Sequence, residues 1–272
     1  MSKHDDLSNE LLGAGETVTA TYTITVKDGS GDNTTDTSAG QTVTVVITGT
    51  NDTPVITAVD VSGAVKEDTI VPVNTLHDSG SVTFTDVDAT DHETATVAFV
   101  GDATSSSAAI PGALHSALQS ALTLQTSAFA TNNGTINGKF NLDNSLVQYL
   151  ADGETVTATY TILVKDDSAT ATDTSAPQTV TVVITGTNDT PVITVVDVSG
   201  AVKEDTALAP GNVLHDTGSV TFADADLTDH ATASVAFVTD STTSAPIPGA
   251  LLTALQGALT LPTNSFASNT GT

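Results

Sequence analysis

The decapeptide TGTNDTPVIT occurs twice in the chain, at Thr48–Thr57 and at Thr185–Thr194. A shift of 137 residues also aligns most of the surrounding sequence. Such a long self-similar period indicates one folded unit repeated in tandem, because the repeats of helical solenoids are much shorter. The period is long enough for an independent domain with its own hydrophobic core.

The phase of the repeat divides the chain into three parts. Residues 58–194 form one complete period, residues 1–57 carry the last part of a period, and residues 195–272 carry the first part of the next. We expect that neither partial piece closes a sandwich alone, because each leaves an apolar face and strand edges in water. Two interpretations remain open at this stage. The chain is a segment of a longer array, or the N-terminal piece of one copy completes the C-terminal piece of the next, head to tail.

Alternating apolar residues predict β-strands throughout the period. In residues 155–164 every second residue is apolar, as in a half-buried strand, and residues 178–184 are the expected hairpin partner. Further strands are expected at residues 16–27, 54–59, 81–85, 95–100 and 134–142. About seven short strands predict an all-β fold of tandem Greek-key sandwiches, of immunoglobulin or cadherin type. Short helical insertions are expected at residues 111–122 and 144–150, the second capped by Asn144 or Ser145.

Acidic residues dominate the charge of the chain. Asp and Glu number 32 against six Lys, with no Arg, and the formal net charge is −26. Such a surface repels nucleic acid and anionic membranes, and no apolar run approaches the ~20 residues that span a bilayer. Because the chain has no Cys, disulfides and thiolate ligands are excluded. Calcium bound by carboxylates is then the expected staple of an extracellular domain.

The strongest candidates for chemistry are oxygen ligands near the repeat junctions. The sequences NDTP at residues 51–54 and 188–191 follow the last strand of one unit and precede the first strand of the next. Their prolines stiffen the link, and their Asn and Asp side chains offer hard oxygen ligands. Asp86 and Asp88, like Asp224 and Asp226, are two residues apart at a strand end, so both carboxylates of a pair can face one cation.

These motifs resemble the VCBS repeat of giant bacterial surface adhesins. The resemblance rests on ITGTNDxPVI with LxxGETxTATYTI upstream, and it covers the complete period and both partial ones. The layout of acidic residues is also similar to that of cadherin repeats, which bind calcium between domains. Gly49 and Gly186 stand where the cadherin linker has Asp, and Ala14 replaces Asp152 in the first copy, so we expect fewer ions per junction and weaker sites.

The resemblance implies a set of calcium ligands at each junction. At the first junction they are Glu16, Asn51, Asp52, Asp86 and Asp88. At the second junction they are Glu67, Asp152, Glu154, Asn188, Asp189, Asp224 and Asp226. The alternative is that these acidic residues only cap turns. The turns at residues 27–33 and 165–167 are expected to be solvated hairpin loops, with a further ion as the alternative.

Histidine offers little support for catalysis. The pair His77-Asp78 and the pair Asp91-His92 both recur in the next repeat, but no Ser lies in a nucleophile elbow. Zinc bound by Asp86, Asp88 and His92 is an alternative that the residue types allow. Because active sites rarely recur along a stalk, we expect structural or loop roles for these histidines and no enzyme.

We therefore expect an extracellular or bacterial cell-surface protein that acts as a structural extender in adhesion or in a biofilm matrix. Its expected partners are neighbouring repeats or copies of itself, together with an unknown surface ligand. The first alternative is a subunit of a self-assembling filament whose partial domains complete one another. A carbohydrate-binding module is less favoured, because such sites usually present aromatic platforms and the chain has no Trp, three Tyr and seven Phe.

Overall fold

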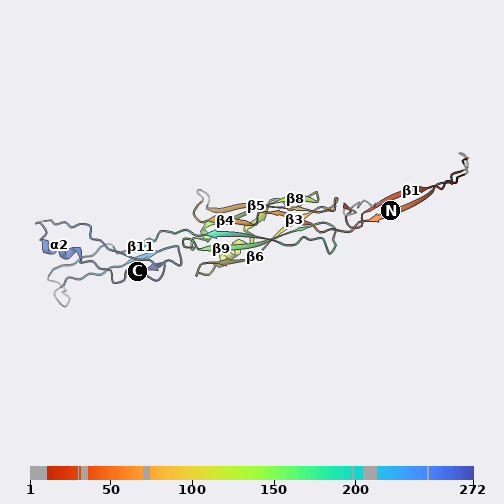
Figure 1. The fold of residues 1–272 in the computed structure, drawn as a ribbon. Helices are drawn as coiled ribbons and strands as arrows, with labels where there is room; N and C mark the ends of the chain where they lie inside the picture. Colours follow the sequence, from red (N-terminus) through yellow and green to blue (C-terminus); the bar gives the residue numbers. More distant parts are fainter. Residues whose placement is uncertain are drawn as a thin grey trace.

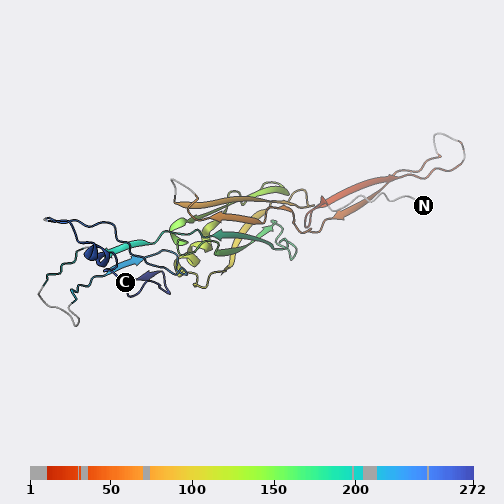
Figure 2. The same ribbon diagram turned by 60° about the vertical axis from the view of Figure 1, so that its left-hand side comes forward.

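The computed structural model describes residues 11–29, 31, 36–69, 74–197, 199–204, 213–243 and 245–272. The molecule is elongated, with a hairpin at one end, a central body, and a more open C-terminal body at the other end (Figure 1). Turning the molecule by 60° leaves this order along the long axis unchanged (Figure 2). The three parts follow one another in the order of the sequence.

Two four-stranded sheets form the central body. The first has the order β4–β10–β9–β6, and its strands are Ser62–Lys66, Gln178–Thr185, Thr155–Lys165 and Thr94–Thr104. The second has the order β3–β5–β8–β7, and its strands are Val55–Val59, Thr75–Thr85, Asn133–Asp143 and Leu122–Leu124. β4 runs parallel to β10, and the other neighbours are antiparallel. This is the strand order of an immunoglobulin-type sandwich, so the predicted all-β fold is confirmed.

The core lies between the inner faces of the two sheets. Every second residue of β9 from Val156 to Val164 is buried, as the alternating pattern predicts. Helix α1 (Gly112–Ala121) follows Pro111 and buries Leu114 and Leu118 against this core. Tyr160 connects the helix to β9, because its hydroxyl donates a hydrogen bond of 2.8 Å to the carbonyl oxygen of Leu118.

The structure departs from the predicted elements in three places. β4 and β7 were not predicted, because one is a Gly-containing pentapeptide and the other has only three residues. β5 begins at Thr75 rather than Ser81, since eleven residue pairs with β8 carry it through a polar stretch. The predicted helical turn is the 3-10 helix η2 (Asn144–Leu146), but its cap is Asp143, whose carboxylate accepts a hydrogen bond from the Ser145 amide. The prediction of Asn144 or Ser145 as cap was therefore wrong.

The two flanking parts are thinner than the central body. The N-terminal hairpin pairs β1 (Thr17–Ile24) with β2 (Gln41–Thr48). The C-terminal body holds β11 (Val192–Val196), β12 (Val220–Ala223), β13 (Thr270–Gly271) and helix α2 (Gly249–Gln256). Both parts expose apolar side chains. Neither helix in the described part of the chain is long and apolar enough to cross a membrane.

Candidate metal centres at the two junctions

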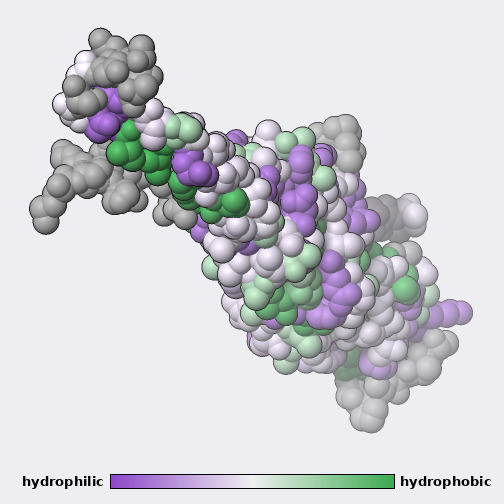
Figure 3. Space-filling model, turned by 90° about the vertical axis from the view of Figure 1, so that its right-hand side faces the viewer, coloured by the Kyte–Doolittle hydropathy of each residue, from purple (hydrophilic) through white to green (hydrophobic). Residues whose placement is uncertain are grey.

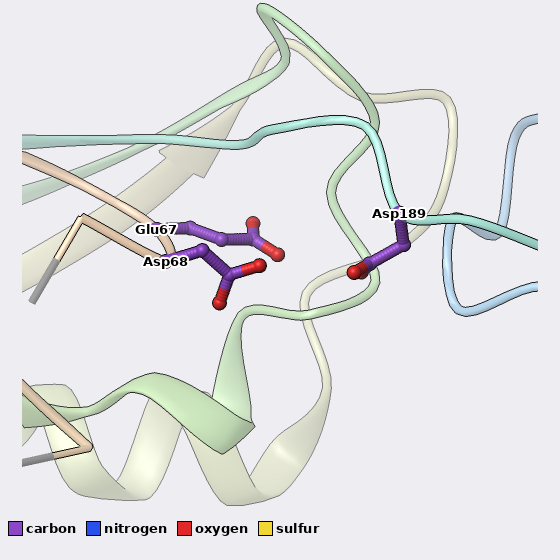
Figure 4. A group of neighbouring side chains, drawn as sticks. All are labelled: Glu67, Asp68 and Asp189. Carbon is purple, nitrogen blue, oxygen red and sulfur yellow. The ribbon is translucent and has the colours of Figure 1, made fainter. Parts of the chain in front are cut away.

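Three carboxylates converge where the central body meets the C-terminal body. Glu67, Asp68 and Asp189 each place one carboxylate oxygen so that all three oxygens lie within 4.8 Å of one another. In Figure 4 the side chains of Glu67 and Asp68 extend from the turn after β4 toward Asp189, which lies in the linker after β10. The two repeats thus contribute to one acidic group, which we call the second-junction cluster together with the neighbouring Asp226.

Hydrogen bonds from the central body hold part of this cluster in place. Gln148 donates to the carboxylates of both Glu67 and Asp68, at 3.0 and 2.9 Å. The side chain of Asn144 accepts a hydrogen bond from the backbone amide of Asp68 and donates one to the Asp68 carboxylate. These bonds hold Asp68 at a φ of 57°, in the left-handed region that Asp tolerates better than most residues. The backbone of the turn after β4 thus directs the carboxylates of Glu67 and Asp68 toward the junction.

The cluster contains buried oxygens that no protein donor satisfies. Glu67 and Asp226 are fully buried, and one oxygen of each, as well as one oxygen of Asp189, has no hydrogen-bond partner among the described residues. Burial raises the pKa of Glu67 to about 8, and the charges of Asp68 and Asp189 add to this rise. Burial likewise raises the pKa of Asp226 to about 6. Close carboxylates without a cation repel one another, which is the condition that a bound metal ion relieves.

Both junctions are built on the same hydrogen-bond pattern. At the second junction the Asp189 amide donates to Asp226 at 2.8 Å, and the Asp226 amide donates to Asp224 at 3.2 Å. At the first junction the corresponding bonds run from Asp52 to Asp88, at 2.8 Å, and from Asp88 to Asp86, at 3.0 Å. At each junction, one of the paired aspartates of a unit thus accepts a hydrogen bond from the linker that precedes that unit.

Two of the predicted ligands, Glu16 and Glu154, form hydrogen bonds across the junctions. Each oxygen of Glu154 accepts a hydrogen bond, one from the amide of Ala151 and one from the hydroxyl of Thr228 in the next unit. Glu16 makes the equivalent bonds to the Gly13 amide and the Thr90 hydroxyl. Their carboxylates are therefore satisfied by protein donors, unlike that of Glu67.

Two further predicted ligands stand apart from the second-junction cluster. Asp152 is exposed in the turn before Glu154. Asn188 is exposed as well, and its amide group donates to the backbone oxygen of Asp189. Among the predicted residues, the structure thus brings Glu67 and Asp189 together. Asp226 and Asp224 are connected to Asp189 by the hydrogen bonds described above.

The first junction contains a larger acidic group that the sequence revealed only in part. The predicted residues Asn51, Asp52, Asp86 and Asp88 are joined there by three acidic residues of the central body. The complete group, which we call the first-junction cluster, consists of Asn51, Asp52, Asp86, Asp88, Asp91, Glu93 and Asp166. Asn51 connects the linker to the central body, because its amide group donates to the carboxylate of Asp166 at 3.1 Å.

More carboxylate oxygens are buried without a hydrogen-bond partner at the first junction than at the second. Glu93 is fully buried, and neither of its carboxylate oxygens has a partner among the described residues. One oxygen each of Asp86, Asp88 and Asp91 is also buried and unpartnered. Burial, together with the charge of Asp86, raises the pKa of Glu93 to about 7. Burial and the charge of Asp88 raise the pKa of Asp91 to about 6.

The donor set of both clusters fits a hard divalent cation. All candidate ligands are carboxylate or amide oxygens, which suit calcium. None of the ion pairs among the described residues involves the unpartnered carboxylates, since the pairs of Lys27, Lys165, His92 and His115 lie elsewhere. The three oxygens that already lie within 4.8 Å of one another belong to the second-junction cluster, and within the described ranges no second group meets that criterion.

The expectation of a solvated loop at residues 165–167 is corrected by the burial of Asp166. This side chain is 2% exposed, and one of its oxygens accepts bonds from both the amide and the hydroxyl of Ser168. Its other oxygen accepts a hydrogen bond from the side-chain amide of the linker residue Asn51. In the other turn, at residues 27–33, Ser30, Asp32 and Asn33 lie outside the described residues.

The histidine alternatives find no support in the geometry. The ring of His92 is exposed and lies 3.4 Å from Asp167, and it forms no ligand group with Asp86 and Asp88 in the described part of the chain. The zinc alternative is therefore disfavoured.

The glycines at the cadherin Asp position have a steric explanation. A Cβ at Gly186 would overlap the carbonyl oxygen of Leu150 and lie 2.6 Å from that of Ala151. At Gly49 it would meet the backbone of Leu12 and Gly13 in the same way. Any side chain at either position must push the closing turn apart, so Asp does not fit there.

Asp91, Glu93 and Asp166 were not among the candidate ligands predicted for the junctions. Asp91 and Glu93 are two residues apart directly before β6, the same spacing that identified Asp86 and Asp88 after β5. This spacing was the available signal, since alternate residues at a strand end face the same side. Asp166 carries no such signal, because only the fold brings the end of β9 to the first junction.

Comparisons with known proteins give distant likenesses only. No protein-family model and no curated protein sequence matches the chain. Among solved structures, the ASH/PapD-like domain 7 of human CEP192 is 7% identical, with a TM-score of 0.30 over 50% of this chain and 86% of that domain. CfaE, the adhesive subunit of CFA/I fimbria of enterotoxigenic Escherichia coli, is 10% identical, with a TM-score of 0.34 over 63% of this chain and 59% of CfaE. Likenesses this distant do not carry a function from those proteins to this chain.

Proposed function

We propose that the chain is a structural extender of a bacterial extracellular adhesin or biofilm matrix protein, with calcium at the junctions between its repeats. The observation that carries the proposal is the set of buried, unpartnered carboxylate oxygens at both junctions. In this role the chain holds other parts of an assembly at a distance and performs no chemistry of its own. Its contacts are neighbouring repeats and a surface ligand that the sequence does not identify.

At the second junction consecutive units contribute to one cluster, and at the first junction the linker and the following unit do, which supports a role in holding the units in line. Glu67 and Asp68 belong to the central body, Asp189 to the linker, and Asp226 to the C-terminal body. The linker amides of Asp52 and Asp189 are already bonded to aspartates of the following unit. A calcium ion at this position neutralises the carboxylates and fixes the linker to both units. Without the ion, repulsion among the same groups loosens the link.

The burial of these groups argues against a role limited to capping turns. An Asp that caps a turn needs one satisfied oxygen and can leave the other in water. Here Glu93 has both oxygens buried without a partner, and it contributes to no turn hydrogen bond through its side chain. Uncompensated buried carboxylates are destabilising unless a proton or a cation accompanies them.

The proposal is tested by titrating the chelator-treated chain with calcium while stability and flexibility are measured. We expect calcium to raise the melting temperature in calorimetry and to narrow the distribution of distances between spin labels placed on the hairpin and on the central body. Magnesium should have a smaller effect, because it requires a tighter octahedral site. If chelation changes neither the melting temperature nor the distance distribution, calcium has no part in the function.

A further inference from the structure

The second sheet of the central body carries a surface depression with a volume of about 490 Å³. Its floor crosses β5 and β8 where Gly80 and Gly138 pair directly opposite each other. Because neither residue has a side chain, the strands are bare at this level and a ligand can lie against the backbone. Pockets that hold small ligands measure roughly 300–1,000 Å³, and the depression falls within that range.

The lining of the depression is mostly polar. It includes two hydroxyl groups, two side-chain amides, an imidazole and an ammonium group, contributed by Ser79, Ser81, Gln125, Asn137, His77 and Lys139. A side-chain amide both donates and accepts hydrogen bonds, as a sugar hydroxyl does. This lining contrasts with the hydrophobic side chains that gather along the projecting hairpin in Figure 3. The depression therefore suits a hydroxyl-rich ligand.

One rim of the depression is acidic. Asp60, at the crossing from β3 to β4, and Asp78 of β5 both line it. The oxygens of Asp78 accept hydrogen bonds from the amides of Ala64, at 3.1 Å, and Ser79, at 2.9 Å, so this carboxylate is fixed. A Cβ at Gly80 would lie 3.3 Å from a carboxylate oxygen of Asp60, which places that carboxylate beside the floor.

The two carboxylates of the rim lack a cationic partner. None of the ion pairs in the described part of the chain involves Asp60 or Asp78. Lys139 also lines the depression, but it belongs to β8, which β5 separates from β3 and from Asp60 beyond the end of β3. The rim thus attracts a cationic group of the ligand, whereas Lys139 is placed to donate a hydrogen bond to another part of it.

A narrow cleft of about 40 Å³ continues from the same rim into the core. It shares Asp60, Asp78 and both glycines with the depression, and Phe140, Ile162 and Val182 form part of its apolar walls. Since one buried water needs roughly 10–15 Å³, the cleft holds a few waters or a methyl group and is too small for a sugar ring. The body of a ligand therefore lies in the depression.

The acidic rim recurs in the next repeat. Asp216, the counterpart of Asp78, accepts hydrogen bonds from the amides of Ala201 and Thr217, both at 2.9 Å. A Cβ at Gly218 would lie 3.2 Å from a carboxylate oxygen of Asp197, the counterpart of Asp60. Successive repeats thus present the same rim, so a polymer with repeated cationic groups gains avidity by binding several of them.

We propose that the depression binds an amino sugar of a polysaccharide chain, with the ammonium group at Asp60 and Asp78 and the ring over the two glycines. Carboxylates select the ammonium group, and the amides and hydroxyls select the sugar hydroxyls. Recognition by charge takes the place of stacking, in keeping with the few aromatic residues of the chain. The site does not depend on the proposed calcium role, because none of its residues belongs to a junction cluster.

Titration of the intact, isotope-labelled chain with glucosamine, followed by NMR in chelator, tests the site. We expect the amide signals of Ala64 and Ser79 to shift and to saturate with a dissociation constant in the millimolar range, roughly. Glucose, which lacks the charge, and propylammonium, which lacks the hydroxyls, should each bind at least about tenfold more weakly. No shift of these signals, or equal binding of glucosamine and either control, overturns the proposal.

Variants of single carboxylates locate the binding. Asp60→Asn should weaken glucosamine binding by at least about tenfold, because it removes one charge of the rim. Asp197→Asn has the same net charge and alters only the rim of the next repeat, so the signals of Ala64 and Ser79 should titrate as in the unaltered chain. Equal weakening by both variants would show attraction to the net charge of the chain and would overturn the site.

A titration with the β-linked disaccharide of glucosamine tests the assignment to a polysaccharide. The depression has room beyond a single ring, so we expect the disaccharide to bind at least about threefold more tightly than glucosamine. Asp60→Asn should weaken the binding of both sugars. Equal or weaker binding of the disaccharide overturns the assignment to a polysaccharide chain.

Discussion

The central body and the flanking parts carry the same sequence motifs in different structural states. SGAVK is a strand next to β10 and irregular at residues 199–203, where no strand lies beside it. Leucines at equivalent helix positions are buried in α1 and exposed in α2. The difference arises from the neighbours of each segment, because its own sequence is unchanged or nearly so. Strand formation here depends on tertiary pairing more than on intrinsic propensity.

The hairpin refines this comparison. β1 and β2 remain strands although their apolar face is exposed, because each satisfies the backbone of the other over eight residue pairs. Residues 199–203 form no strand. Pairing of backbone groups is therefore sufficient for a strand in this chain, and burial of the inward face adds stability to the body that contains it.

The largest expected difference between the regions concerns the two equivalent tyrosines. Tyr160→Ala should lower the free energy of unfolding of the central body by about 3–5 kcal/mol, because it removes a fully packed ring from the core. Tyr22→Ala should leave that free energy unchanged, since the ring of Tyr22 touches no core. Chemical denaturation of both variants, at a concentration where the chain is monomeric, measures the contrast.

The Tyr160→Phe variant separates packing from hydrogen bonding. It loses only the bond to the Leu118 carbonyl, and we expect a loss of about 1 kcal/mol. If Tyr22→Ala destabilised the central body as much as Tyr160→Ala, the two regions would share one core and the comparison would fail.

The next effect concerns the glycines that close the two equivalent turns. Gly186→Ala should destabilise the central body by about 1–3 kcal/mol, because the added Cβ overlaps the backbone of Leu150. Gly49→Ala creates the same overlap with Leu12 in the hairpin link, so it should leave the unfolding of the central body unchanged. Gly101→Ala serves as the control, since nothing lies within 4 Å of a Cβ placed there. Equal melting temperatures for the Gly186 and Gly101 variants would show that the turn at Gly186 accommodates a Cβ by a backbone shift of little energetic cost.

A third effect compares Glu67, which is buried in the second-junction cluster, with Glu204, its exposed counterpart in the C-terminal body. Glu67→Gln should weaken the stabilisation by calcium, with a loss of about tenfold in affinity or about 1.4 kcal/mol. Glu204→Gln should have no effect on the monomer, because Glu204 is exposed. In chelator the sign for Glu67→Gln should reverse, since the amide removes a buried carboxylate and still accepts the bond from Gln148. Calorimetry of both variants with and without calcium measures the two signs, and an unchanged calcium response in Glu67→Gln would remove this residue from the ligand set.

Sequence patterns predicted the fold well where side chains alternate and poorly where pairing alone makes the strand. The alternation in residues 155–164 identified β9, and the leucine spacing identified α1. β4 and the first half of β5 have weak apolar patterns and exist because β10 and β8 lie beside them. No local pattern contains that information.

The same limit applies to the candidate site. The pair Asp86 and Asp88 was visible as two acids with one residue between them at a strand end. Glu67 was visible as an acid that could reach the junction, and the resemblance to a known repeat implied it as a ligand. Asp166 could not be assigned, because the first junction is assembled from chain segments more than 100 residues apart, such as Asn51 and Asp166. Glu16 and Glu154 looked like ligands, whereas the structure gives both of their oxygens protein donors.

A fourth expected effect is the pH dependence of the chelator-treated chain. Burial raises the pKa of Asp91 to about 6, that of Glu93 to about 7 and that of Glu67 to about 8. The native state therefore keeps protons that the unfolded chain releases above about pH 4.5. Because the native state binds more protons, the free energy of unfolding falls as the pH rises, and the fall ends near pH 8.

We therefore expect the central body to melt at a temperature several degrees lower at pH 8 than at pH 5 when calcium is chelated. Calcium should cancel this trend, since the ion takes the place of the protons and binds more tightly as the carboxylates ionise. The double variant Glu67→Gln with Glu93→Gln should show a flatter pH profile in chelator, because two of the three groups can no longer titrate. Calorimetry between pH 5 and pH 8 measures the profile. A melting temperature that rises with pH in chelator would contradict this prediction. It would mean that these carboxylates are ionised and compensated in the native state, so that the pKa values of buried and exposed junction acids differ less than the structure indicates.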